Sequence, residues 1–138
     1  MPPVPDELVK AYRNANYRVH AQPPFELRVD NFSIDLDRVL ESTRSASAAL
    51  LTAYNPQSHK RPAPENAAAQ AELKGAVAAH VCLEAEGRGE GWPPEPSLLV
   101  LGLTRSEAAT LARRFGQHAY LYCEPKRPVE LVLVEKIA

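Results

Sequence analysis

The stretch that decides the fold is Ala48-Ala49-Leu50-Leu51-Thr52-Ala53-Tyr54-Asn55-Pro56. Residues 48–54 are apolar without the alternation of a half-exposed strand, and this predicts a central strand covered on both faces. Asn55 and Pro56 follow as turn formers, so the strand is expected to end there. The stretch therefore predicts a buried strand that ends in polar groups, as a ligand pocket requires.

An alanine-rich helix is predicted over residues 64–80, with Pro64 in its first turn and Glu65 near its positive end. One helical stripe runs along it at spacings of four, three and four, and consists of Asn66, Gln70, Leu73 and Val77. Because the last two are apolar, the stripe faces the core, and the two amides extend it toward the end of strand 48–54. A buried amide without a partner costs about 1–3 kcal/mol. The expected partners are loop backbone, Asn55 or a ligand.

The remaining pattern alternates short helices and strands. Helices are predicted over 6–16, 34–44 and from Thr104 to Gly116, and strands over 17–20, 25–30, 81–86, 98–103, 119–123 and 129–134. From residue 48 onward the order is βαββαβ (ferredoxin-like) with an added C-terminal strand. We therefore expect an α+β fold with a mixed β-sheet and packed helices, while another α+β or three-layer topology stays open. A single domain is expected over 1–138, with 1–45 as an N-terminal scaffold and 46–138 as the core that carries the motifs.

Composition excludes several classes of function. The 138 residues are 45% hydrophobic and 24% charged, with a net charge of -1, which is typical of a globular protein and gives no general attraction to nucleic acid. No apolar run approaches the roughly 20 residues of a membrane-spanning helix, and residues 1–7 lack the pattern of a signal peptide. Cys82 and Cys123 are isolated and read as buried free thiols of a reducing compartment. A cytoplasmic location without membrane association is expected.

Two further polar side chains occupy positions suited to chemistry. Glu95 sits between two prolines, where a rigidly held carboxylate acts as a general base or binds an amine or ribose, or else serves as a cap or surface group. Gln117 follows Gly116 at a junction between helix and strand. The basic loop 58–61 suits an anionic ligand or is simply solvated. The four histidines show no metal spacing and the dinucleotide fingerprint is absent, so no metal or cofactor is expected.

Taken together, the motifs resemble the bacterial DUF3293 proteins. The residues that carry the resemblance lie between 48 and 122 and are Thr52-Ala53-Tyr54-Asn55-Pro56, Glu65-Asn66 with Gln70 and Leu73, Glu95 with Ser97, and Phe115-Gly116-Gln117-His118-Ala119. The resemblance implies that the residues to test first are Asn55, Glu65, Asn66, Gln70, Glu95 and Gln117. It brings no reaction with it. His118 departs from the asparagine expected in the family motif.

Two hypotheses of different class follow. In the first, a polar pocket at the strand-to-helix turn binds a small anionic or nucleotide-like ligand, and the six side chains converge on one cleft. The amides of Asn55, Asn66, Gln70 and Gln117 would then hold the ligand, with Glu95 or Glu65 as the candidate acid–base group if catalysis occurs. In the second, the protein is a non-enzymatic interaction or structural module whose polar set clamps the loop 55–66. Binding of nucleic acid through Lys60, Arg61, Arg113 and Arg114 lacks the basic excess that it requires.

Overall fold

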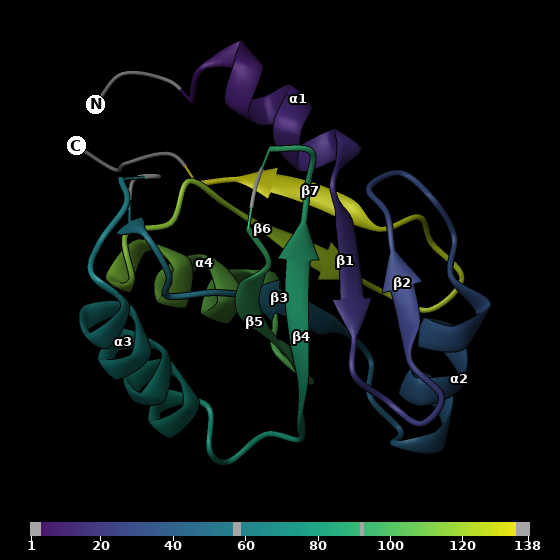
Figure 1. The fold of residues 1–138 in the computed structure, drawn as a ribbon. Coiled ribbons are helices and arrows are strands. Elements are labelled where there is room, and N and C mark those ends of the chain that lie inside the picture. Colours follow the sequence, from purple (N-terminus) through teal and green to yellow (C-terminus); the bar gives the residue numbers. More distant parts are fainter. Residues whose placement is uncertain (1–3, 57–58, 92, 135–138) are drawn as a thin grey trace.

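The frame of the molecule is a seven-stranded antiparallel sheet (Figure 1), seen in a computed structural model that describes residues 4–56, 59–91 and 93–134. The elements in chain order are α1 (Asp6–Asn14), β1 (Asn16–Val19), β2 (Phe25–Leu27), α2 (Ile34–Ser42), β3 (Ala48–Leu51), α3 (Ala63–Ala76), β4 (Cys82–Arg88), β5 (Glu95–Leu101), α4 (Arg105–Arg114), β6 (Ala119–Cys123) and β7 (Glu130–Leu133). The α+β class is confirmed.

The expectation of a mixed sheet is wrong. The strand order is β2-β1-β4-β5-β3-β6-β7, and every neighbouring pair is antiparallel. The reason lies in the two helical connections. The connection through α3 leaves β5 between β3 and β4, and the connection through α4 leaves β3 between β5 and β6. Strands that run in the same direction are therefore separated by one that runs the opposite way.

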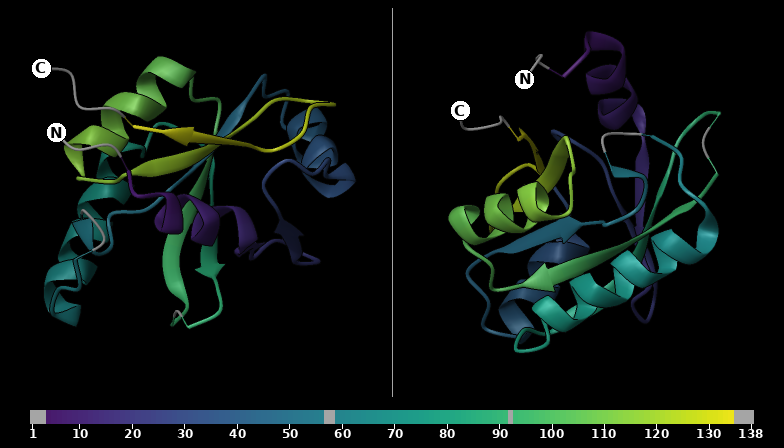
Figure 2. Two further views of the ribbon diagram at one scale, coloured as in Figure 1. Left: turned by 90° about the horizontal axis from the view of Figure 1, so that it is seen from above. Right: turned by 90° about the vertical axis from the view of Figure 1, so that its left-hand side faces the viewer.

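Helices cover both faces of the sheet (Figure 2). One face packs against α2 through Leu36 and Leu40, and the other packs against α3 and α4 through residues such as Leu73 and Ala108. All four residues of β3 are buried. This explains the uniformly apolar sequence of that strand, since each side chain meets a core on its own face.

Side chains decide where β3 ends. The predicted strand 48–54 stops at Leu51, because the next groups leave the sheet ladder for side-chain partners. The hydroxyl of Thr52 donates to the carbonyl of Pro96 at 2.7 Å, and the N–H of Ala53 donates to Oε1 of Gln70 at 2.9 Å. The buried backbone N–H of Ala53 is thus satisfied by a side chain of α3 and not by a neighbouring strand.

Two other local predictions have clear outcomes. Thr104 lies at the start of α4, where the helix was predicted to begin, and forms a capping box with Glu107. The connection between the predicted strands 81–86 and 98–103 is shorter than expected, because β4 continues to Arg88 and β5 already begins at Glu95.

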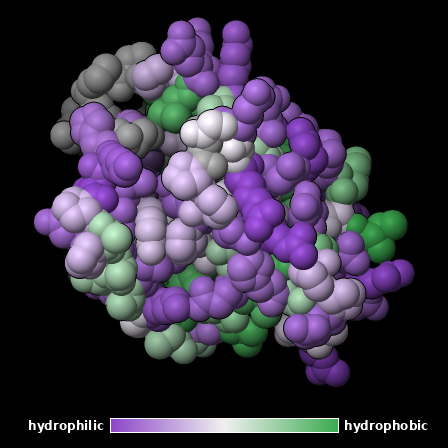
Figure 3. Space-filling view, in the orientation of Figure 1, coloured by the Kyte–Doolittle hydropathy of each residue, from purple (hydrophilic) through white to green (hydrophobic). Residues whose placement is uncertain are grey.

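The visible surface is mainly hydrophilic, with apolar atoms in small separate groups (Figure 3). Across residues 4–56, 59–91 and 93–134, every helix is too short or too polar to cross a membrane.

Candidate functional site

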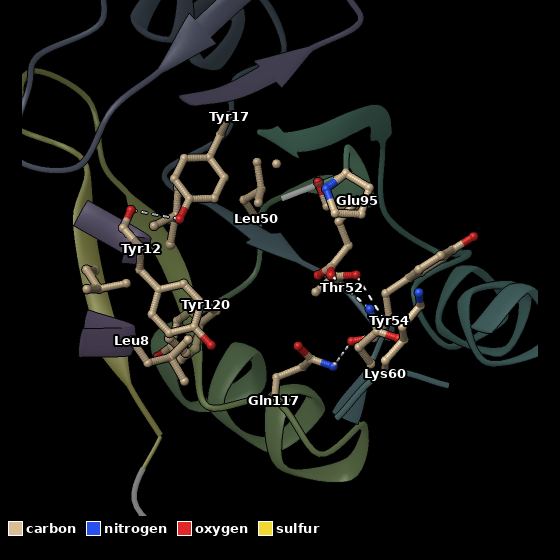
Figure 4. Close-up of a pocket in the computed structure, with 17 residues that line it drawn as sticks. Leu8, Tyr12, Tyr17, Leu50, Thr52, Tyr54, Lys60, Glu95, Gln117 and Tyr120 are labelled. Atoms are coloured by element: carbon tan, nitrogen blue, oxygen red, sulfur yellow. Dashed lines mark hydrogen bonds between the residues drawn. The ribbon is translucent and has the colours of Figure 1, made fainter. Parts of the chain in front are cut away.

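A cavity of about 420 Å³ lies on the face of the sheet that α2 covers in part. It is lined by Leu8, Tyr12, Tyr17, Leu50, Thr52, Tyr54, Asn55, Lys60, Gly87, Pro93, Glu95, Ser97, Gln117, Ala119, Tyr120, Leu121 and Leu131. Leu8 and Tyr12 of α1 lie across the open space from Glu95 and Gln117 (Figure 4). The cavity therefore has a mostly apolar side formed by α1 and β1, and a polar side formed by the turn after β3, the start of β5 and the residues just before β6.

The register of the sheet explains the hollow. Tyr17 of β1 pairs with Gly87 of β4, and Gly87 pairs with Glu95 of β5. Residues paired in this way point to the same face of a sheet. Gly87 has no side chain, and a Cβ built there would already meet the Tyr17 ring at 3.5 Å. The missing side chain thus lets the Tyr17 ring lie against the Gly87 backbone, on the same face of the sheet as Glu95.

Glu95 is the one acidic residue among the described cavity-lining side chains. It is half-buried, and its carboxylate accepts a long hydrogen bond of 3.4 Å from Nδ2 of Asn55. Burial raises the pKa of Glu95 above its usual range, and the bond from Asn55 offsets only part of that effect. The charged form of this carboxylate is consequently under-stabilised by its surroundings.

Gln117 and Ser97 add polar atoms beside Glu95. Nε2 of Gln117 donates to the carbonyls of Tyr54 at 3.0 Å and Phe115 at 3.2 Å, which orients the amide and turns Oε1 toward the open space (Figure 4). Ser97 is 3% exposed and lines the cavity, yet its Oγ has no hydrogen-bond partner among the described residues. A buried hydroxyl of this kind usually has a partner.

Next to the polar side of the cavity, Asn55 and Asn66 are joined by reciprocal hydrogen bonds. The N–H of Asn55 donates to Oδ1 of Asn66 at 2.9 Å, and Nδ2 of Asn66 donates to Oδ1 of Asn55 at 2.8 Å. Arg61 adds its backbone N–H to Oδ1 of Asn55 at 3.0 Å. Asn55 has a φ of 44°, a left-handed conformation that asparagine tolerates better than most residues. The network fixes the turn that positions Asn55 beside Glu95.

The sequence-predicted residues fall into three groups. Asn55, Glu95 and Gln117 line the cavity. Asn66 and Gln70 are buried, do not line it, and bond to the backbone of residues 53–55. Glu65 is exposed on the first turn of α3 and also lies outside the lining. One amide of the second group is incompletely satisfied, since Nε2 of Gln70 is buried without a partner in the described part of the chain.

The residues of the basic loop 58–61 also differ in their surroundings. Arg61 turns inward, where its guanidinium donates to Oδ1 of Asn66 at 3.3 Å and to the carbonyl of Ala53 at 3.4 Å. His59 and Lys60 are exposed, and Ser58 lies outside the described residues. On α4, Arg114 pairs with Glu72 at 3.0 Å. The guanidinium groups of Arg61 and Arg114 therefore already bond to other groups of the protein.

The N-terminal part supplies cavity residues that sequence reasoning missed. Leu8 and Tyr12 come from α1 and Tyr17 from β1, within the region expected to be scaffold only. The available signal was the shared helical face of Leu8 and Tyr12. That signal marks a face of the helix that packs on something, and it does not tell what that face meets. Among the described residues, no cluster of three or more His, Cys, Asp or Glu side chains is arranged to hold a metal ion.

Fold and site together define an α+β protein with an antiparallel sheet and a side cavity of mixed polar and apolar character. The sequence model of a family described as "Protein of unknown function (DUF3293)" matches residues 51–120. The chain belongs to this family, which confirms the resemblance seen in the motifs. Neither the curated proteins nor the solved structures contain a match.

Proposed function

We propose that the protein binds a small organic ligand in the 420 Å³ cavity. The observation that carries this proposal is that Asn55, Glu95 and Gln117, from three separate segments, line one cavity with a mostly apolar opposite side. A concave, largely apolar site with a few convergent polar groups is typical of small-molecule binding.

The polar side of the cavity indicates which chemical groups the ligand would carry. Glu95 and Oε1 of Gln117 are hydrogen-bond acceptors, so they suit a ligand that presents N–H or O–H groups. This supports the nucleotide-like part of the sequence hypothesis, since nucleobase edges carry such donors. The anionic part has less support, because Lys60 is the sole cation in the described lining and is exposed. If a reaction takes place, Glu95 is the candidate acid–base group, since Glu65 lies outside the cavity.

Asn66 and Gln70 support the second hypothesis in a limited form. We propose that these two amides clamp the end of β3 and do not touch the ligand, since their bonds go to backbone groups of residues 53–55. A purely structural role for the whole protein would leave the polar side of the cavity without a purpose.

Two finer proposals concern the fold and its location. We propose that β6, β3, β5 and β4 form a ferredoxin-like unit, supported by their order in the sheet and by the packing of α3 and α4 on one face. We also propose a cytoplasmic location, supported by the free thiols of Cys82 and Cys123.

The test is a thermal-shift screen with nucleosides, nucleotides, amines and amino-acid derivatives, followed by ¹H–¹⁵N NMR titration of each compound that raises the Tm. The proposal expects the shifted amide signals to gather at cavity-lining residues. Ala119→Met, which adds a chain inside the cavity, should weaken binding, whereas Ala71→Met at an exposed site of α3 should not. Shifts that gather at residues outside the cavity, or a screen without any compound that binds, would contradict the proposal.

A further inference from the structure

We infer that the ligand of the cavity carries an amine, held at Glu95, on a flat or apolar body that lies toward Tyr12 and Tyr17. This inference rests on the proposed function and specifies its ligand class.

The polar atoms of the cavity that lack partners favour a ligand that carries hydrogen-bond donors. Nε2 of Gln117 is committed to two backbone carbonyls, so the amide offers only its oxygen. The carboxylate of Glu95 receives a single long bond from the described residues and takes part in no ion pair there. Ser97 adds a buried hydroxyl that can accept or donate. An ammonium group, with three donors and no acceptor, complements this set.

The opposite side of the cavity favours an aromatic or apolar body. The hydroxyl of Tyr17 donates to the backbone carbonyl of Tyr12 at 2.9 Å, so its ring and not its polar tip is left for the cavity. Leu8, Leu50 and Leu121 complete the apolar lining. Aromatic rings also attract cations through their faces, which adds to the preference for an amine.

Charge decides between an amine and an acid. A half-buried carboxylate without a cationic partner has part of its desolvation cost uncompensated, and an ammonium group at hydrogen-bond distance offsets that cost. An anionic ligand would instead add a second negative charge beside Glu95. Lys60 provides a compensating charge at the cavity, but it is exposed and therefore well solvated. The raised pKa of Glu95 agrees with an acid that lacks its counter-charge, and binding of a cation is then expected to lower that pKa.

Three probes with one body separate the alternatives. They are 2-phenylethylamine, 2-phenylethanol and phenylacetate, titrated by calorimetry and by ¹H–¹⁵N NMR at pH 7. The amine should bind at least about tenfold more tightly than the alcohol, the ratio expected from one charge-assisted hydrogen bond. Glu95→Gln should remove that preference, Glu95→Asp should keep part of it, and the exposed control Glu65→Gln should leave it unchanged.

The amine inference is overturned if the alcohol or the acid binds as tightly as the amine, or if Glu95→Gln keeps the preference while the NMR spectrum shows a folded protein. It also fails if the wider panel yields cavity ligands that contain no amine. In each of these cases the cavity proposal still stands. If no compound in either set shifts cavity signals, both proposals fail.

Discussion

Asn66 and Asn55 exchange two hydrogen bonds, in which Oδ1 of Asn66 accepts from the backbone of Asn55 and Nδ2 of Asn66 donates to the Asn55 side chain. The pair connects the first turn of α3 to the turn that follows β3. Because Nδ2 of Asn55 reaches Glu95 at 3.4 Å, the same pair also fixes one neighbour of the cavity carboxylate.

Replacement of Asn66 by Ala should lower the free energy of unfolding by about 1–3 kcal/mol, since it removes a buried amide and leaves the part-buried N–H of Asn55 without its acceptor. Urea unfolding followed by circular dichroism measures the change. The neighbouring Glu65→Ala is the matched control, because Glu65 is exposed on the same turn and should change stability by no more than about 0.5 kcal/mol. Equal effects of the two substitutions would argue against the clamp.

Replacement of Asn55 by Gly should be tolerated better than replacement by Ala. Both variants lose the side-chain bonds to Asn66 and Arg61. The Ala variant is further destabilised by the φ of 44° at this position. This left-handed conformation costs most residues about 1 kcal/mol and glycine almost nothing. The difference in unfolding free energy between the two variants isolates this backbone term. An Ala variant as stable as the Gly variant would show that the left-handed turn is absent in solution.

Two buried serines should respond differently to replacement by Ala. The hydroxyl of Ser47 donates to the carbonyl of Leu103, so Ser47→Ala should cost about 1–3 kcal/mol. Ser97 is equally buried but its Oγ has no partner in the described chain, so Ser97→Ala should leave the ligand-free stability unchanged or slightly higher. Thermal denaturation in the absence of ligand tests the contrast. A large loss at Ser97 would mean that its hydroxyl is satisfied within the protein.

The stability of Glu95→Gln relative to the natural protein should depend on pH. Burial raises the pKa of Glu95 in the folded state, so the folded protein keeps this proton to higher pH than the unfolded chain, whose value is about 4.3. Stability is therefore lost as the pH rises from the unfolded value to the folded one. The Gln variant has no such loss, so its advantage should grow across this window and then level off.

Unfolding by urea at a series of pH values from 4 to 8 measures that advantage. Hydrogen bonds with Thr104 and Arg105 lower the pKa values of Glu107 and Glu130, respectively. The stabilising contributions of these two carboxylates are therefore lost as the pH falls, in both proteins. Their contributions cancel in the difference. An advantage that is constant with pH would show that burial does not perturb Glu95.

Much of the fold follows from local patterns. The apolar run of β3 and the capping box of Thr104 each have a strong signal within a few residues, and both elements formed as predicted in kind. The directions of neighbouring strands had no such signal, because pairing depends on which strand enters between β3 and β4. A βαβ sequence is compatible with adjacent parallel strands or with separated ones.

Only part of the candidate site could be predicted from the sequence. Asn66 and Gln70 were placed on the core stripe of their helix by spacing, and both are buried there. Whether such a residue meets backbone or a cavity depends on atoms several ångströms beyond the helix, which spacing does not encode. The partnership of Gly87 with Tyr17 and Glu95 likewise depends on sheet register across three strands.

The two sides of the cavity come from different parts of the chain. Glu95 and Gln117 lie inside residues 51–120 that define the DUF3293 match, whereas Leu8, Tyr12, Tyr17 and Leu131 lie outside them. Under the proposed function, the residues within the family match supply the polar groups that anchor the ligand, and the flanking segments supply the side of the cavity toward which its body lies. For the proposed ligand, exchange of the first 20 residues between family members should alter the preferred size of the ligand body and leave its anchoring group the same. The range of ligands and the membership of the family would then depend on different parts of the chain.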